Sequence, residues 1–150
     1  MLLNYILSDK NDWYVNRNSI AELLAPIIFN EARIKYQGSL QTIQTSTNAV
    51  CGTEDYIVKI FAPEVCGYNP LCDLKREVYA LELVGTTTIR APRLIAHGLF
   101  EYGYYFYYCI IERIHIPPVS QFLLSCSQSD IIKLGNRLRE TLKILQSLNP

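Results

Sequence analysis

Residues 55–61 read DYIVKIF, an almost entirely apolar run that contains one lysine. Side chains alternate between the two faces of a β-strand, so Ile57, Lys59 and Phe61 are expected to share one face. The alternate positions are apolar as well, which is typical of a strand that is covered on both sides. A lysine in such a strand must extend its ammonium group to water or meet a negatively charged group.

The composition indicates one globular domain. The chain has 150 residues, of which 49% are hydrophobic and 19% are charged. A chain of this length and composition can bury a substantial core. The 14 basic and 14 acidic residues balance and form no basic run, which argues against a sequence-independent nucleic-acid partner.

The sequence also favours a soluble, cytoplasmic protein without a membrane partner. The opening MLLNYIL is soon interrupted by SDKND and lacks a basic segment, unlike a signal peptide, and no apolar stretch reaches the roughly 18 residues of a membrane span. The five cysteines are odd in number and include no CxxC pair. Buried free thiols in a reducing compartment explain them better than disulfides or a zinc site.

The first half of the chain predicts one helix and three strands. Ser19 and Glu22 have the spacing of a capping box, which indicates a helix over residues 19–32 that is short or kinked at Pro26. Three stretches rich in Thr, Val, Ile and Tyr then have short polar links, as in an antiparallel meander. These predicted strands cover residues 32–40, 43–51 and 55–61.

The second half predicts a helix, a hairpin and a final helix. Apolar residues recur at helical spacing over residues 71–85, with Asp73 and Gly85 as candidate caps. Residues 93–103 and 104–114 are expected to form two strands joined near Gly103, and residues 127–148 form a long amphipathic pattern. The expected fold is therefore α+β, with a five-stranded antiparallel sheet, a helix between strands 3 and 4, an N-terminal helix and a long C-terminal helix.

Four short motifs in this order resemble those of a known family. The chain is similar to the kinase-like amino-terminal lobe of the aminoglycoside phosphotransferase and choline kinase group, over about residues 31–148. The resemblance implies an N-terminal helical segment over residues 1–30, a nucleotide-binding lobe over 31–116, and a hinge and helix over 117–150 that lead to a C-terminal lobe. The motifs are Lys59 in VKIF, REVYAL at 76–81, PRLIAHG at 92–98 and IIERI at 110–114.

The resemblance assigns the opening lysine a role in ATP binding. Lys59 would contact the α- and β-phosphates, and Glu77 on the following helix would pair with it and hold it extended. Glu82 is a competing partner, but it lies five residues further along and points to another helix face. Lys59 could instead extend to water, and Glu77 could be an ordinary solvated carboxylate.

The family pattern also implies residues for the phosphates and the adenine base. A turn of Gly38, Ser39, Leu40 and Gln41 would lie over the phosphates, although an ordinary hairpin glycine explains Gly38 as well. The hinge would run from Ile111 through Glu112 and Arg113 to Ile114, and its backbone would bind the adenine edge. Ile57 and Ile111 would wall the base, or else belong to the strand core.

Several other polar and aromatic residues are interpreted as structural. His97 and His115 have no nucleophile or metal partner at a recognisable spacing, so neither is expected to be catalytic and no metal site is predicted. The dense aromatic cluster near the hairpin lacks interleaved Lys or Arg. We interpret it as packing, not as a base-stacking surface. It comprises Tyr102, Tyr104, Tyr105, Phe106, Tyr107 and Tyr108.

The chain contains no match to the catalytic motifs of the family. Phosphoryl transfer needs Mg²⁺ ligands and a residue that orients the acceptor, which the family carries in its C-terminal lobe in an H-x-D-x-x-x-x-N loop. The positions two residues after His97 and His115 are Leu99 and Pro117, not aspartate. We therefore expect this chain by itself to be catalytically silent, either as part of a longer kinase or as a complete half-kinase. Its lobe-facing surface should need a C-terminal lobe, in the same or another chain, or a second copy.

Three hypotheses follow for function. The first is the ATP-binding lobe of a small-molecule phosphotransferase that acts on a hydroxyl compound such as an aminoglycoside, choline or a sugar, with ATP and Mg²⁺ as cofactors. The second is a non-enzymatic interaction or regulatory module that uses a half-kinase fold. The third is an unrelated α+β domain in which the lysine occurs by chance.

Overall fold

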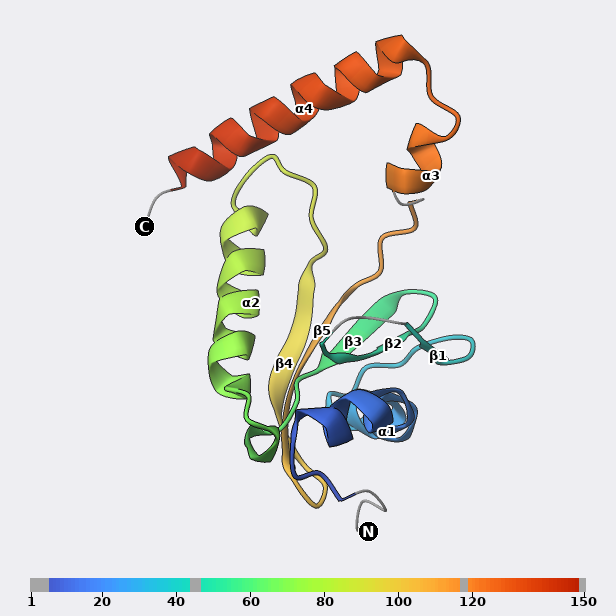
Figure 1. Ribbon diagram of the computed structural model, residues 1–150, viewed down its shortest axis with the longest axis vertical. Coiled ribbons are helices and arrows are strands. Elements are labelled where there is room, and N and C mark those ends of the chain that lie inside the picture. The colour runs from blue at the N-terminus through green and yellow to red at the C-terminus, as the bar shows by residue number, and fades with distance from the viewer. Residues whose placement is uncertain (1–5, 44–46, 117–118, 149–150) are drawn as a thin grey trace.

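Five antiparallel strands and the helices on both sides of them make up the fold (Figure 1). The computed structural model describes residues 6–43, 47–116 and 119–148. The strands lie in the order β1-β2-β3-β5-β4, and every neighbouring pair is antiparallel. This confirms the predicted α+β class and the helix inserted between the third and fourth strands. The strands are β1 (Gln41–Thr42), β2 (Ala49–Gly52), β3 (Tyr56–Ile60), β4 (Leu94–Glu101) and β5 (Tyr105–Glu112).

Helix α1 (Lys10–Glu31) covers one face of the sheet. Its buried residues recur at helical spacing, so one stripe of the helix faces the strands. The Trp13 indole Nε1 donates a hydrogen bond of 2.7 Å to the Thr47 carbonyl, which joins the helix to the residues just before β2. Val58 and Ile60 of β3 are fully buried on this side.

Helix α2 (Pro70–Gly85) covers the other face beside β4 and β5 (Figure 1). Leu74 packs with Phe61, Cys109 and Ile111 in a second, smaller apolar cluster. Strand β3 therefore has packed side chains on both faces, as its double-sided apolar pattern predicts. Burial on two sides restricts how Lys59 can reach water.

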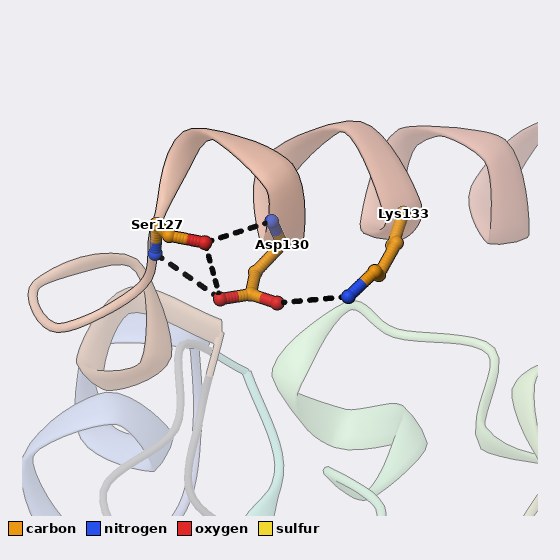
Figure 2. A network of polar contacts seen from close by, with 3 residues as sticks. All are labelled: Ser127, Asp130 and Lys133. Carbon is orange, nitrogen blue, oxygen red and sulfur yellow. Dashed lines mark hydrogen bonds and ion pairs between the residues drawn. The ribbon is translucent and has the colours of Figure 1, made fainter.

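The C-terminal helices α3 (Val119–Leu123) and α4 (Gln128–Ser147) follow β5. Figure 2 shows how α4 begins: the Ser127 hydroxyl accepts from the Asp130 N–H, and the Asp130 carboxylate accepts from the Ser127 N–H. Lys133 adds an ion pair of 3.5 Å to the same carboxylate. No residue of α4 is buried. Its large exposed apolar side chains are Ile131, Ile132, Leu138, Leu142 and Leu145.

The first helix and the first strand differ from the sequence-based expectation. Helix α1 is capped by Asp9, which accepts from the Asp12 N–H, so the predicted start at Ser19 is wrong. The helix extends further toward the N-terminus because residues before Ser19, such as Trp13, are buried against the sheet, and it continues past Pro26 to Glu31. Tertiary burial thus outweighs a local capping signal.

The strand predicted over residues 32–40 is also wrong, because these residues form no strand and β1, which pairs with β2, begins at Gln41. Within the predicted second strand, residues 44–46 lie outside the described residues, as do Pro117 and Pro118 beyond the last strand. Helix α2 is capped by Asn69 rather than Asp73, since its helical residues begin at Pro70. Gly85 is the last helical residue, and the C-cap is Thr86 rather than the predicted Gly85.

Two further expectations concern membranes and thiols. In the part of the chain that the structure describes, no helix combines the length and apolar character needed to cross a bilayer. All five cysteines are free thiols, and Cys51, Cys66 and Cys109 are buried. Buried free thiols were the expectation for the five cysteines, but Cys72 and Cys126 are only half-buried.

Candidate functional site

Lys59 of β3 and Glu77 of α2 form an ion pair between the sheet and the helix. The Lys59 Nζ donates to the Glu77 Oε1, and 26% and 28% of the two side chains remain exposed. The predicted pairing is therefore present, and the alternative of a fully solvated Lys59 is excluded. Glu82, the competing carboxylate, is exposed and forms no ion pair in the described part of the chain.

The surroundings of the pair are apolar on the strand side. Cys109 of β5 is the register partner of Lys59, and its side chain is fully buried. Burial raises the pKa of the Cys109 thiol to about 12, and the nearby Glu77 carboxylate raises it further than the Lys59 ammonium lowers it. The thiol is therefore neutral at pH 7, so Lys59 receives its negative partner from the helix and not from the sheet.

Ile57 and Ile111 are directly opposite each other in neighbouring strands. Both belong to the apolar cluster beneath α2, where Ile111 is buried and Ile57 is half-buried. Ile57 shares the face of Lys59, two residues away along β3. Ile57 thus adds half-buried apolar area next to the ammonium, whereas Ile111 belongs to the core.

The predicted hinge is connected to the rest of the sheet through its backbone. The Glu112 N–H donates to the Arg93 carbonyl at 2.9 Å, and the Arg113 N–H donates to the Asp55 carbonyl at 2.8 Å. The Ile114 N–H makes no hydrogen bond to any described residue. Of these three hinge amides, only that of Ile114 is available to a ligand.

Side chains also hold the hinge segment against the turn between β2 and β3. The Arg113 guanidinium donates to the Thr53 carbonyl at 2.5 Å, and the His115 Nε2 lies 2.5 Å from the Glu54 carbonyl. The Glu112 carboxylate accepts from Arg93, and this hydrogen bond lowers the pKa of the Glu112 carboxyl. His115 thus has a structural contact, in agreement with its interpretation from the sequence.

The segment predicted to lie over the phosphates occupies another position in the chain. Gly38, Ser39 and Leu40 come before β1, and the connection between β1 and β2 is formed by residues 43–48. Their assignment to the turn between the first two strands is therefore wrong, because β1 begins at Gln41, after these residues. Gly38 has φ of +77°, so its backbone does occupy the left-handed region that favours glycine. Among the described residues, no hydrogen bond or ion pair joins these three residues to Lys59.

Val50 is a candidate site residue that sequence reasoning missed. It is the β2 register partner of Lys59, so the two side chains share one face of the sheet. Any group that Lys59 binds at this face would meet Val50 as well. Because side chains alternate between the two faces of a strand, the sequence shows which residues of β2 share a face. Only the register between β2 and β3 identifies Val50 as the neighbour of Lys59.

The remaining residues singled out from the sequence are placed in the scaffold. His97 is exposed on β4. Among the described residues, no group of three or more His, Cys, Asp or Glu side chains could hold a metal. Phe106 and Tyr108 are buried, and the Tyr104 hydroxyl accepts from the Leu7 N–H at 2.9 Å. Burial raises the pKa of the Tyr108 hydroxyl. These contacts agree with a packing role for the aromatic cluster.

Comparison of the sequence with models of known protein families gives no match, and comparison with curated proteins gives none. The geometry around Lys59 therefore carries the functional argument, together with the resemblance of the four short motifs.

Proposed function

We propose that this chain is the ATP-binding lobe of a small-molecule phosphotransferase. Its acceptor would be a hydroxyl compound of the class that includes aminoglycosides, choline and sugars. The single observation that supports this most strongly is the ion pair between Lys59 and Glu77, which spans the sheet and the helix inserted between β3 and β4. In this arrangement the carboxylate fixes the ammonium, and the ammonium can bind phosphate oxygens.

The surroundings of the pair fit a nucleotide. Ile57 offers half-buried apolar surface for the adenine ring, with the buried Ile111 behind it, and the Ile114 N–H can donate to the adenine edge. The fixed hinge would orient the base, since Arg113 and His115 hold that segment against the β2–β3 turn. The adenine contact would thus come from backbone and apolar groups, and the phosphate contact from Lys59.

The remaining groups for phosphoryl transfer would come from a C-terminal lobe, in this chain or another. Such a lobe would supply the Mg²⁺ ligands and the residue that orients the acceptor hydroxyl. The exposed apolar side chains of α4, including Leu138 and Leu142, give this lobe a surface on which to pack. Without it we expect only weak binding of Mg·ATP and no transfer.

Titration with Mg·ATP tests the proposal. We expect the wild-type chain to bind with a dissociation constant in the high-micromolar range or weaker, and Lys59→Ala to weaken binding about tenfold or more through loss of a charged hydrogen bond. Lys143→Ala is the matched control, because Lys143 pairs with the exposed Glu140 on α4. Equal affinities for the wild type and Lys59→Ala would contradict the assignment, provided that circular dichroism shows both folded.

The second candidate function is a non-enzymatic interaction module. It is favoured by the exposed apolar surface of α4 and by the absence of an H-x-D motif after His97 or His115 in the sequence. This hypothesis expects the chain to bind nucleotide or a partner without transferring phosphate. Transfer of phosphate from Mg·ATP to a hydroxyl acceptor, once a C-terminal lobe is supplied, would decide for the phosphotransferase lobe.

A further inference from the structure

Strand β4 is an open edge of the sheet. It stands last in the strand order, with β5 as its neighbour on one side (Figure 1). Its eight residues, Leu94–Glu101, include no proline and no lysine, the residues that commonly protect an edge from pairing. A bulge between Leu94 and Ala96 disturbs only the beginning of the strand. The regular edge is therefore the second part of β4.

The hydrogen bonds of β5 show which of its residues turn toward β4. The Tyr107 carbonyl accepts from the Phe61 N–H at 2.9 Å, so Tyr107 is turned toward β3. The Glu112 N–H donates to the Arg93 carbonyl, so Glu112 is turned the other way. Backbone groups alternate along an antiparallel strand, and residues an even number of positions from Glu112 are therefore turned toward β4.

The same alternation identifies the free groups of β4. Tyr108 and Phe106 are turned toward β4, and their register partners there are Gly98 and Phe100. These two β4 residues thus direct their N–H and C=O groups to β5. The residues between and beside them direct theirs outward, away from the sheet. The outward-directed residues are His97, Leu99 and Glu101.

The side chains at these three positions are self-complementary. They lie on one face, are all exposed, and place a histidine and a glutamate symmetrically on either side of a leucine that is 52% exposed. In an antiparallel pair centred on Leu99, His97 of each copy faces Glu101 of the other. A shift by two residues would place His97 opposite Leu99 and lose both polar pairs. The register centred on Leu99 is therefore the one that the side chains favour.

The neighbouring helix extends this apolar centre. A hollow of about 380 Å³ lies between α2 and β4, and Leu99 forms part of its wall together with Leu74, Val78 and Tyr107. Tyr79 of α2 is 53% exposed at the same hollow. A second Leu99 placed opposite the first would continue this surface across the edge, since directly paired residues have Cβ atoms about 5 Å apart.

We propose that β4 pairs antiparallel with β4 of a second copy of this chain, about a two-fold axis through Leu99. Each outward-directed residue exchanges N–H···O=C hydrogen bonds with the residue opposite it in the second copy. In a single copy these backbone groups bond to water. The two sheets become one continuous sheet, and the contact is closed because both copies use the same surface. The polar pairing between His97 and Glu101, formed twice, selects a second copy as the occupant.

Sedimentation equilibrium tests the pairing in a background that carries Leu138→Glu and Leu142→Glu, which removes association through the apolar face of α4. We expect this background to dimerise. His97→Glu should weaken the dimer about thirtyfold, because two facing pairs change from attraction to repulsion. Adding Glu101→Lys to His97→Glu should restore the dimer to within about threefold. Gln37→Glu, an equal charge change at an exposed site away from β4, should leave the mass unchanged.

Hydrogen exchange of residues 94–101 gives a second, site-specific measurement. The outward amides of His97, Leu99 and Glu101 should exchange more slowly as the concentration of the background protein rises. The proposal is overturned if the background protein stays monomeric, or if it dimerises without slower exchange at these amides. It is also overturned if adding Glu101→Lys to His97→Glu fails to restore the dimer. The substituted positions are exposed, so the variants should fold, and circular dichroism verifies this.

Discussion

Neutralising Glu77 is the perturbation that tests most directly how the sheet accommodates Lys59. Glu77→Gln keeps the shape of the side chain but leaves the Lys59 ammonium without a carboxylate, beside the buried Cys109. Lys59→Met removes the charge and keeps an apolar stem of similar length. The double variant removes both charges and leaves no unpaired ion.

The exposure of the pair sets the size of the effect. Pairs at the surface contribute about 0–1 kcal/mol, whereas breaking a fully buried pair costs about 3–5 kcal/mol. With 26% and 28% of the two side chains exposed, we expect an intermediate value. Glu77→Gln should lower the free energy of unfolding by about 2 kcal/mol and Lys59→Met by about 1 kcal/mol, and the double variant should lie within about 1 kcal/mol of the wild type.

Urea denaturation followed by circular dichroism measures all four proteins. The coupling energy of the double-mutant cycle should be about 2 kcal/mol or more if the midpoints change at a constant slope. The pair between Lys143 and Glu140 is the matched control, because 62% and 65% of those side chains are exposed. Its cycle should give less than about 0.5 kcal/mol. Equal coupling energies in the two cycles would refute the reasoning that the sheet restricts Lys59 to its helix partner.

Three other predictions concern packing and thiols. Gly98→Ala should lower the free energy of unfolding by about 1–3 kcal/mol, because the new Cβ would lie 2.9–3.2 Å from the Tyr108 ring and hydroxyl. Gly135→Ala, whose Cβ would meet nothing within 4 Å, should raise the free energy of unfolding by up to about 1 kcal/mol. Thermal unfolding compares the two variants with the wild type. A thiol reagent at pH 8 should modify Cys126 long before Cys109 in the folded protein, and equal rates would contradict the burial of Cys109. Folding raises the pKa of the Cys109 thiol from 9.0 to about 12, so the buried neutral thiol contributes to stability below pH 9. This contribution is lost as the pH rises toward 12, and urea denaturation at several pH values should detect the loss of stability.

The sequence predicted the elements with strong periodic patterns. The strand around Lys59, the helix that carries Glu77 and the hairpin of β4 and β5 all lie where hydrophobic spacing and turn residues place them. Those signals are local, since each depends on a few neighbouring residues. The first helix and the first strand were misplaced because Trp13 is buried by contacts far away in the sequence, and because β1 pairs over only two residues.

The sequence by itself determined that an isolated ammonium would stand in a doubly covered strand and that a helix carboxylate would follow eighteen positions later. Only the tertiary structure decided that Lys59 and Glu77 meet, that Val50 lies beside them, and that β4 remains at an edge with outward-directed amides. Those facts depend on strand order and register, which arise from packing between residues distant in the chain. A pattern of residue types fixes which face a side chain takes, but not which strand lies next to it.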